Sequence, residues 1–369
     1  MFWAILMLIV VIVLIFLIVY LTIKFRKLFC MKIENKILSY LVALIPIVIV
    51  FLTWNYMNSV VILFHLVIFI LISNLVFKFI NKNRKKKDKI SENIITICGL
   101  ICGVIYLGIG LFLDYHVFET TYNVYTNKDM GVSGGLKILQ ISDSHVGTTF
   151  NGKGFSSHVD RMNKVENIDA VVITGDFVDD DTTYEDMVES CKALSKFNTK
   201  YGVYFIYGNH DKGYYNYRNF DDNDLRNELS KNNVVILEDE VVELNDYVYL
   251  IGRQDGYVYD RTPIKELVSN LDKEKFSIVL NHEPNDYKNE RESNVDLVLS
   301  GHTHGGQLFP LGYIGLLLKQ NDMFKGIKKI DNTTFIVNTG ISDWAMDFKT
   351  GTKSEYTIIN IIGSDKNGI

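Results

Sequence analysis

The chain has 369 residues, which is enough for about two domains. Its formal net charge is -5, so overall charge gives no indication of a nucleic-acid partner. Only Cys191 of its four cysteines lies outside the apolar N-terminal part, and a single cysteine there cannot form an internal disulfide that would indicate an oxidising compartment.

Apolar residues dominate positions 1–115 and predict a helical membrane region. Four apolar runs occur there, each close to the roughly 20 residues that a helix needs to span the hydrocarbon. The first run lacks the basic start and the small-residue cleavage site of a signal peptide, so it is interpreted as a span. The second run is the weakest, because it is shorter and contains Pro46. The four runs are 3–23, 37–54, 60–79 and 94–113.

Basic residues between these runs predict an orientation. Lys and Arg are frequent in 24–36 and in 78–89, whereas 55–59 is uncharged and 114–126 contains neither. Positively charged loops stay in the cytoplasm, so both basic loops are expected inside and the C-terminal domain outside. The prediction is a multi-pass membrane protein with an extracytoplasmic C-terminal domain. If one run does not span, that domain lies in the cytoplasm instead.

Residues 136–369 alternate short apolar runs with amphipathic ones, which predicts an α/β domain preceded by a linker at 116–135. Runs such as 171–173 are continuously apolar, as expected of strands that are covered on both faces. The predicted helices are 155–165, 184–197 and 222–229. The predicted strands are 136–142, 170–174, 203–207, 234–237, 247–252, 277–281, 297–300, 334–337 and 356–361.

Metal-binding residue types follow five of the predicted strands directly. In open α/β sheets, sites form beyond the carboxyl ends of the strands, so these five segments could converge on one crevice. Each segment alone has a common structural explanation as a turn or a helix cap. Five of them in order, each after a strand, are hard to explain without a shared site. The segments are 143–145, 175–176, 208–211, 282–284 and 301–304.

The donor atoms in these segments indicate the kind of metal. They are carboxylate oxygens, an amide oxygen and imidazole nitrogens, without a thiolate. This mixture suits Mn, Fe or Zn and disfavours copper(I) or a cysteine-bound structural zinc. Asp143 and His145, like His302 and His304, are two residues apart, so each pair can point to the same side of a strand end.

The five segments resemble the signature of the calcineurin-like metallophosphoesterases. The match covers about 136–362, and the run 300–307 together with 282–284 resembles the bacterial membrane-associated branch typified by YkuE and YaeI. The resemblance implies a four-layer α-β-β-α sandwich, with two mixed sheets flanked by helices, after the N-terminal membrane region. It also implies a site that binds two divalent metal ions.

Carried over by position, the resemblance implies a role for each residue. Asp176 would bridge the two metals, and His210 matches the family's catalytic histidine that is not a ligand. In the tail, Lys349, Lys353 and Glu355 stand where that branch usually has an arginine near a closing acidic residue. The ligands of the first metal would be Asp143, His145 and His304, and those of the second Asn209, His282 and His302.

The sequence therefore predicts a membrane-anchored, metal-dependent phosphoesterase. It would hydrolyse a phosphomonoester, a phosphodiester or a pyrophosphate by means of a metal-bound hydroxide, with a phosphate-containing substrate and the lipid bilayer as its partners. One alternative is a lipid-linked (pyro)phosphate hydrolase of the envelope, and another is a non-catalytic metal-containing membrane receptor. The aromatic residues Tyr214, Tyr215, Tyr217 and Phe220 could form an apolar lid or simply pack.

Overall fold

The computed structural model describes residues 2–131, 135–213, 217–256 and 258–363. The chain divides into two compact units, Met1–Phe112 and Leu113–Ile369. The division lies close to the end of the predicted membrane region.

The first unit is helical. Three of its helices, α2, α3 and α4, are long and apolar enough to cross a membrane, as judged over the part of the chain that the structure describes. The predicted run 3–23 lies in α1, a 28-residue helix that is not among these three. The helices are α1 (Phe2–Phe29), α2 (Lys36–Thr53), α3 (Tyr56–Lys82), the short 3-10 helix η1 (Lys86–Asp88) and α4 (Glu92–Tyr115), whose last turn belongs to the second unit.

Close packing of small and polar residues joins α3 to α4. A Cβ atom on Gly99 would lie 2.6 Å from the Cα atom of Ile70, so only glycine allows the two backbones to approach this closely. His65 is buried, and its Nδ1 lies 2.8 Å from the Val61 carbonyl oxygen while its ring stacks on Tyr106. His65 therefore serves helix packing.

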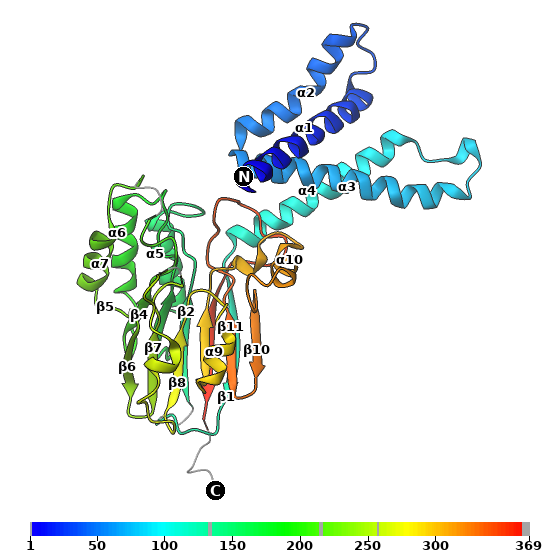
Figure 1. Ribbon diagram of the computed structural model, residues 1–369. Helices are drawn as coiled ribbons and strands as arrows, with labels where there is room; N and C mark the ends of the chain where they lie inside the picture. Colours follow the sequence, from blue (N-terminus) through cyan, green and yellow to red (C-terminus); the bar gives the residue numbers. More distant parts are fainter. Residues whose placement is uncertain (1, 132–134, 214–216, 257, 364–369) are drawn as a thin grey trace. The chain divides into compact units, whose positions relative to one another are not determined.

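The second unit contains two six-stranded sheets that pack face to face (Figure 1). Strands β2 to β5 are parallel in the first sheet, and β7, β8, β9 and β11 are parallel in the second. The order in the first sheet is β1 (Phe118–Tyr125), β12 (Glu355–Ile362), β2 (Leu136–Ile141), β3 (Ala170–Thr174), β4 (Val203–Ile206), β5 (Val234–Ile236). The order in the second is β10 (Gly326–Ile330), β11 (Thr333–Val337), β9 (Leu297–Ser300), β8 (Phe276–Leu280), β7 (Val248–Gly252), β6 (Glu240–Asn245).

Alternate residues of each central strand face different apolar cores. In β3, Val171 and Ile173 pack against helices, whereas Val172 faces the second sheet. The second sheet likewise turns Val279 away from the first sheet, toward short helices on its outer face. The predicted four-layer α-β-β-α sandwich is thus confirmed. The outer helices are α5 (Gly152–Met162), α6 (Tyr184–Leu194) and α7 (Asp222–Lys231) on the first sheet, and α8 (Ile264–Leu267) and α9 (Tyr287–Glu292) on the second.

The stretch that the sequence analysis treats as a linker contains strand β1. This strand pairs in parallel with β12, from Phe118 beside Glu355 to Tyr125 beside Ile362. It lies at the edge of the first sheet, and most of its side chains are exposed or half-buried. Such a strand needs few apolar residues, so its sequence gives only a weak signal.

Candidate metal centre

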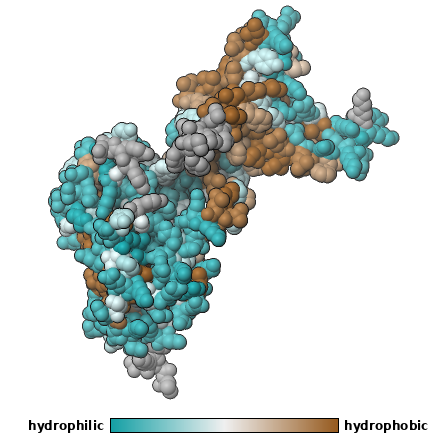
Figure 2. Space-filling model, in the orientation of Figure 1, coloured by the Kyte–Doolittle hydropathy of each residue, from teal (hydrophilic) through white to brown (hydrophobic). Residues whose placement is uncertain are grey.

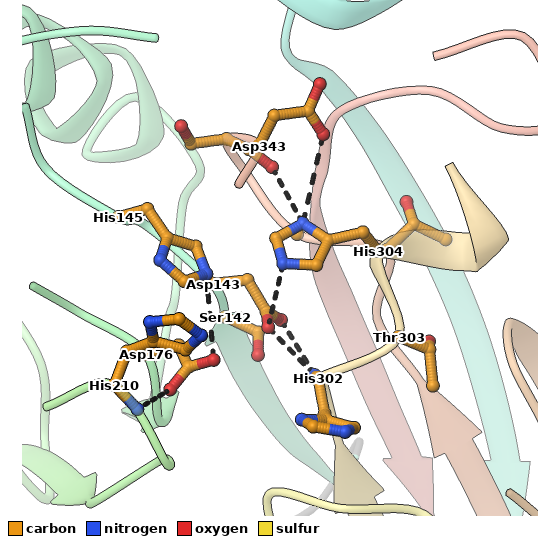
Figure 3. Close-up of polar contacts among 12 residues, drawn as sticks. Ser142, Asp143, His145, Asp176, His210, His302, Thr303, His304 and Asp343 are labelled. Atoms are coloured by element: carbon orange, nitrogen blue, oxygen red, sulfur yellow. Dashed lines mark hydrogen bonds and ion pairs between the residues drawn. The ribbon is translucent and has the colours of Figure 1, made fainter. Parts of the chain in front are cut away.

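The five predicted segments meet at one end of the sandwich. They follow β2, β3 and β4 in the first sheet and β8 and β9 in the second, so the carboxyl ends of parallel strands bring them together. Backbone pairing continues past the strand ends, because the amide nitrogens of Asp143 and His145 donate to the carbonyl oxygens of Gly175 and Asp176. Figure 3 shows side chains from these segments pointing toward a common centre.

A first group consists of Asp143, His145 and His304. One donor atom from each of the three lies within 4.8 Å of the other two, and all three residues are buried. The distance from His304 Nε2 to Asp143 Oδ1 is 3.7 Å, which is too long for a hydrogen bond. His145 Nε2 is buried and has no hydrogen-bond partner. A divalent cation among these atoms would satisfy the orphaned nitrogen and the buried carboxylate together.

A second group consists of Asp176, His282 and His302, again with donor atoms within 4.8 Å of one another. The side-chain oxygen of Asn209 joins them, at 3.2 Å from His282 Nε2 and 2.9 Å from His302 Nδ1. His282 is held from behind, since its Nδ1 lies 2.7 Å from the Thr174 carbonyl oxygen. This contact turns Nε2 toward the group, as is usual for a histidine that binds a metal.

Asp176, a member of the second group, also faces the first. Its Oδ2 atom is 3.6 Å from His145 Nε2 in the first group and 3.2 Å from His282 Nε2 in the second. Its Oδ1 atom accepts a hydrogen bond of 2.8 Å from the His210 amide. One carboxylate oxygen therefore faces both groups, which is the position that a bridging ligand requires.

The backbone at the centre is unusual. Five of the predicted ligands have positive φ angles: Asp143 (51°), His145 (35°), Asp176 (52°), His302 (69°) and His304 (45°). Such left-handed conformations cost of order 1–3 kcal/mol each for residues other than glycine, and they cluster at functional sites. Close packing also requires glycine at position 208, where a Cβ atom would lie 2.3 Å from Asp176 Oδ1.

Burial and mutual charge shift the pKa values of these groups. Burial, assisted by the charge of His282, lowers the pKa of His302 to about 4, which leaves its imidazole neutral and able to bind a metal. Burial alone would raise the pKa of Asp176. The neighbouring histidines, His282 first among them, outweigh burial and hold that pKa well below its ordinary value. A permanently ionised Asp176 suits a ligand shared by two cations.

Asp179 lies beside the centre and was not among the predicted site residues. Its Oδ2 lies 2.9 Å from His145 Nδ1 and its Oδ1 lies 3.0 Å from His210 Nδ1. These are hydrogen-bond distances, so this carboxylate can orient both rings, and the three side chains also offer donor atoms within 4.8 Å of one another. The signal was present, because Asp179 comes three residues after Asp176, but the predicted segment ended at 176.

Asp211 was quoted in a predicted segment without a role, and the structure gives it one. It is fully buried, and its two oxygens accept hydrogen bonds from four backbone amides at 2.7–3.1 Å, those of Asp176, Phe177, Val178 and Gly208. Asp211 thereby fixes the turn after β3 to the turn after β4. It positions Asp176 through the backbone.

The tail residues lie outside both groups. Lys349 is fully buried, and its Nζ donates to the carbonyl oxygens of Thr339, Gly340 and Ser342 at 2.9–3.2 Å. It also lies 3.4 Å from Asp343, whose carboxylate approaches His304 (Figure 3). Lys349 therefore fixes the loop behind His304. Lys353 lies over the ring of Phe118 and 3.9 Å from Glu355.

The aromatic residues after Asp211 do not share one environment. Tyr214 and Tyr215 lie outside the described residues. Phe220 is buried in the core between the first sheet and its helices, so it packs. Tyr217 is 80% exposed. The described part of this cluster therefore gives no support to an apolar lid.

Comparison with known proteins agrees with the resemblance seen in the sequence. A family model described as calcineurin-like phosphoesterase matches residues 136–306. An uncharacterized metallophosphoesterase of Aquifex aeolicus is 33% identical over 258 residues, which cover 68% of this chain and 93% of the relative. The uncharacterized metallophosphoesterase YkuE of Bacillus subtilis is 28% identical over 69% of this chain and 89% of its own length.

A further relative is named as a transmembrane protein. The Bos taurus "Transmembrane protein with metallophosphoesterase domain" is 27% identical over 256 residues, which cover 64% of this chain and 55% of that protein. Among its curated relatives this chain thus spans from about half to nearly all of the other protein's length.

Proposed function

Because this chain belongs to the calcineurin-like metallophosphoesterase family, we propose that it is a membrane-anchored hydrolase of a phosphomonoester, a phosphodiester or a pyrophosphate. The observation that carries the proposal is the position of Asp176 between two groups of donor atoms, 3.6 Å from His145 and 3.2 Å from His282. A dinuclear site needs such a shared carboxylate. A site that binds a single metal does not.

Each donor group would hold one divalent ion. Asp143, His145 and His304 hold the first, and Asn209, His282 and His302 hold the second, with Asp176 on both. The donors include no thiolate, which favours Mn, Fe or Zn. When bound, a pair of such ions acidifies a water molecule and offsets the charge of the phosphate oxygens.

His210 is the proposed catalytic residue. Asp179 holds its Nδ1 at 3.0 Å, so Nε2 is the nitrogen that can donate a proton to the leaving oxygen. General acid catalysis of this kind contributes about 10²–10⁴-fold to the rate. Its ring lies 5.6 Å from that of Trp344, a half-exposed side chain beside the centre.

A lipid-linked phosphate or pyrophosphate is the second candidate substrate. A cavity of about 270 Å³ beside His302 supports it, since Leu311, Leu316, Phe324 and Trp344 contribute apolar lining. The three helices that could span a membrane, counted over the described residues, would place the enzyme near such a substrate.

The test of the activity uses the full chain, purified in detergent and stripped of metal with a chelator. Turnover of p-nitrophenyl phosphate and bis-p-nitrophenyl phosphate should return when Mn²⁺ is added back, and it should be absent in an His302→Ala protein. His158→Ala is the matched control, because His158 pairs with Arg161 on α5, away from the donor groups. Two bound metals without turnover would indicate a narrower substrate range. A protein that binds no metal would overturn the proposal.

The proposed topology is multi-pass with the catalytic unit outside the cytoplasm. Its support is the distribution of Lys and Arg, which are frequent at 24–36 and 78–89 and absent from 114–126. A C-terminal fusion to a reporter that fluoresces only in the cytoplasm should therefore stay dark. The same reporter on residues 1–85 should fluoresce. Bright cells from the full-length fusion would place the catalytic unit inside.

A further inference from the structure

An apolar stretch of the catalytic unit faces outward beside the metal centre. It surrounds the short helix α10 (Leu311–Leu317), none of whose side chains is buried. Figure 2 shows it as a brown area on the mostly teal surface of this unit. The side chains that form this stretch, called the α10 patch below, are Phe309, Leu311, Tyr313, Ile314, Leu317 and Leu318, which are 43–81% exposed.

The α10 patch differs from the rest of the catalytic unit. Single exposed apolar side chains are common on soluble proteins, whereas contiguous ones mark an interaction site. Among the described residues of Leu113–Ile369, every strongly exposed leucine lies in this stretch. Most of the other large hydrophobic residues that are exposed on this unit are tyrosines, which have a polar end.

The packing of α10 explains why its apolar side chains point outward. Glycine at position 312 lets the inner side of the helix approach its neighbours closely, since a Cβ atom on Gly312 would lie 2.4 Å from the Phe324 ring. A Cβ atom on Gly306 would lie 2.4 Å from the Cα atom of Gly312, so the helix is pressed against the segment that carries His302 and His304. The Thr303 hydroxyl donates to the Phe324 carbonyl oxygen at 2.7 Å and fixes this arrangement. An ordinary amphipathic surface helix turns its apolar side chains toward the core, whereas α10 turns them toward the outside.

Hydrogen bonds within the catalytic unit connect the α10 patch to the end of α4. The Leu113 carbonyl oxygen accepts a hydrogen bond of 2.8 Å from the Ser354 amide. Three residues earlier along the same loop, Gly351 donates its amide to the Gln307 carbonyl oxygen, and the Phe309 amide donates to the Thr350 hydroxyl at 3.1 Å. One loop therefore contacts both the last turn of a candidate membrane span and the start of the α10 patch.

We propose that the α10 patch inserts into the surface of the lipid bilayer and holds the entrance of the metal centre against it. If α4 spans the membrane, Tyr115 marks the membrane surface, and the loop at 350–354 lies there with it. The patch has the composition of an interfacial segment, with leucine and isoleucine beside tyrosine, followed by Lys319. Trp344, 45% exposed, stands beside the cavity next to it. The inference uses the proposed membrane anchoring but not the proposed catalysis.

The test measures what surrounds the α10 patch in the full chain. The four native cysteines are replaced by alanine, and a nitroxide spin label is attached to a new cysteine in Ile314→Cys. Val235→Cys on β5 is the matched control, because Val235 and Ile314 are both β-branched and both 43% exposed. Leu317→Cys provides a second label in the patch, should the first disturb the fold. The proteins are reconstituted into phosphatidylcholine–phosphatidylglycerol vesicles.

Collision rates of each label with oxygen, which concentrates in the bilayer, and with a water-soluble nickel chelate distinguish the outcomes. We expect labels at 314 and 317 to favour oxygen and the label at 235 to favour the chelate. Equal access of the chelate to all three positions would overturn the proposal. Exclusion of both reagents from 314 and 317 would also overturn it, because protein would then cover the patch, from a second copy if the effect grows with the protein-to-lipid ratio. Neither result depends on phosphoesterase activity.

Discussion

An Asp176→Ala protein is expected to lose both metal ions and with them nearly all of its activity. One oxygen of Asp176 faces His145 of the first group and His282 of the second. Its removal leaves only neutral donors in the second group, namely Asn209, His282 and His302, and such a set suits Mn²⁺ less well than one that contains a carboxylate. If the pair of metals contributes about 4 kcal/mol to transition-state stabilisation, kcat/KM should fall by roughly 10³-fold or more.

The comparison that isolates the carboxylate uses two further proteins. Asp176→Asn keeps the size of the side chain and should still lower the metal content measured by mass spectrometry. Asp181→Ala removes an exposed aspartate from the same loop and should change neither metal content nor rate. An Asp176→Ala protein that retained two metals per chain and its rate would rule out the bridging role.

The convergence of the proposed ligand residues could be predicted because it depends on local patterns. A buried strand such as β3 reads as an apolar run, and a polar residue directly after it must lie at the sheet edge. Once β2, β3 and β4 are parallel neighbours, their carboxyl ends meet, so Asp143, Asp176 and Asn209 come together. The burial of these strands makes the sequence signal strong.

Asp179 and Asp211 were harder to predict because their partners lie on other loops. Asp179 contacts His145, 34 positions earlier, and His210, 31 positions later. Their geometry depends on how the loops after β2, β3 and β4 curl, and in these loops Asp143, His145 and Asp176 adopt left-handed conformations. No sequence pattern in a single chain specifies such a turn for aspartate or histidine.

Strand β1 and the α10 patch were missed for opposite reasons. β1 is an exposed edge strand with Thr120, Thr121 and Asn123 among its eight residues, so its apolar pattern is faint. The stretch around α10 is strongly apolar, but Pro310, Gly312 and Gly315 interrupt it as they would a loop. The exposed apolar side chains of the α10 patch do not pack into a core of the described structure. A prediction based on core burial therefore could not place them.

Replacement of Asp179 by asparagine is expected to impair metal binding and catalysis together. In the native protein each carboxylate oxygen faces the Nδ1 atom of one histidine. Asparagine offers one oxygen and one NH₂ group, so one of the two rings must change tautomer or turn away. Metal affinity should fall by about 10–100-fold through His145. If His210 is the ring that turns, the rate with saturating metal should fall by a further factor of about 10²–10⁴.

The metal-free protein gives this variant an independent signature in the pH dependence of its stability. Burial would raise the pKa of Asp179, but hydrogen bonds from His145 and His210 outweigh it and hold that pKa below its ordinary value. Burial would likewise lower the pKa of His145, but Asp179 and Asp176 raise it to about 9. Asp179 therefore stabilises the fold above the unfolded pKa of about 3.9, and this contribution disappears as the pH falls through the folded pKa. The contribution of His145 is complete below its unfolded pKa of about 6.5 and is lost as the pH rises through 9.

Unfolding of metal-free native and Asp179→Asn proteins in detergent should thus differ most between pH 4 and 6.5, less toward pH 9, and least in strong acid. A difference that did not vary with pH would mean that Asp179 contributes by packing rather than by holding the two imidazoles.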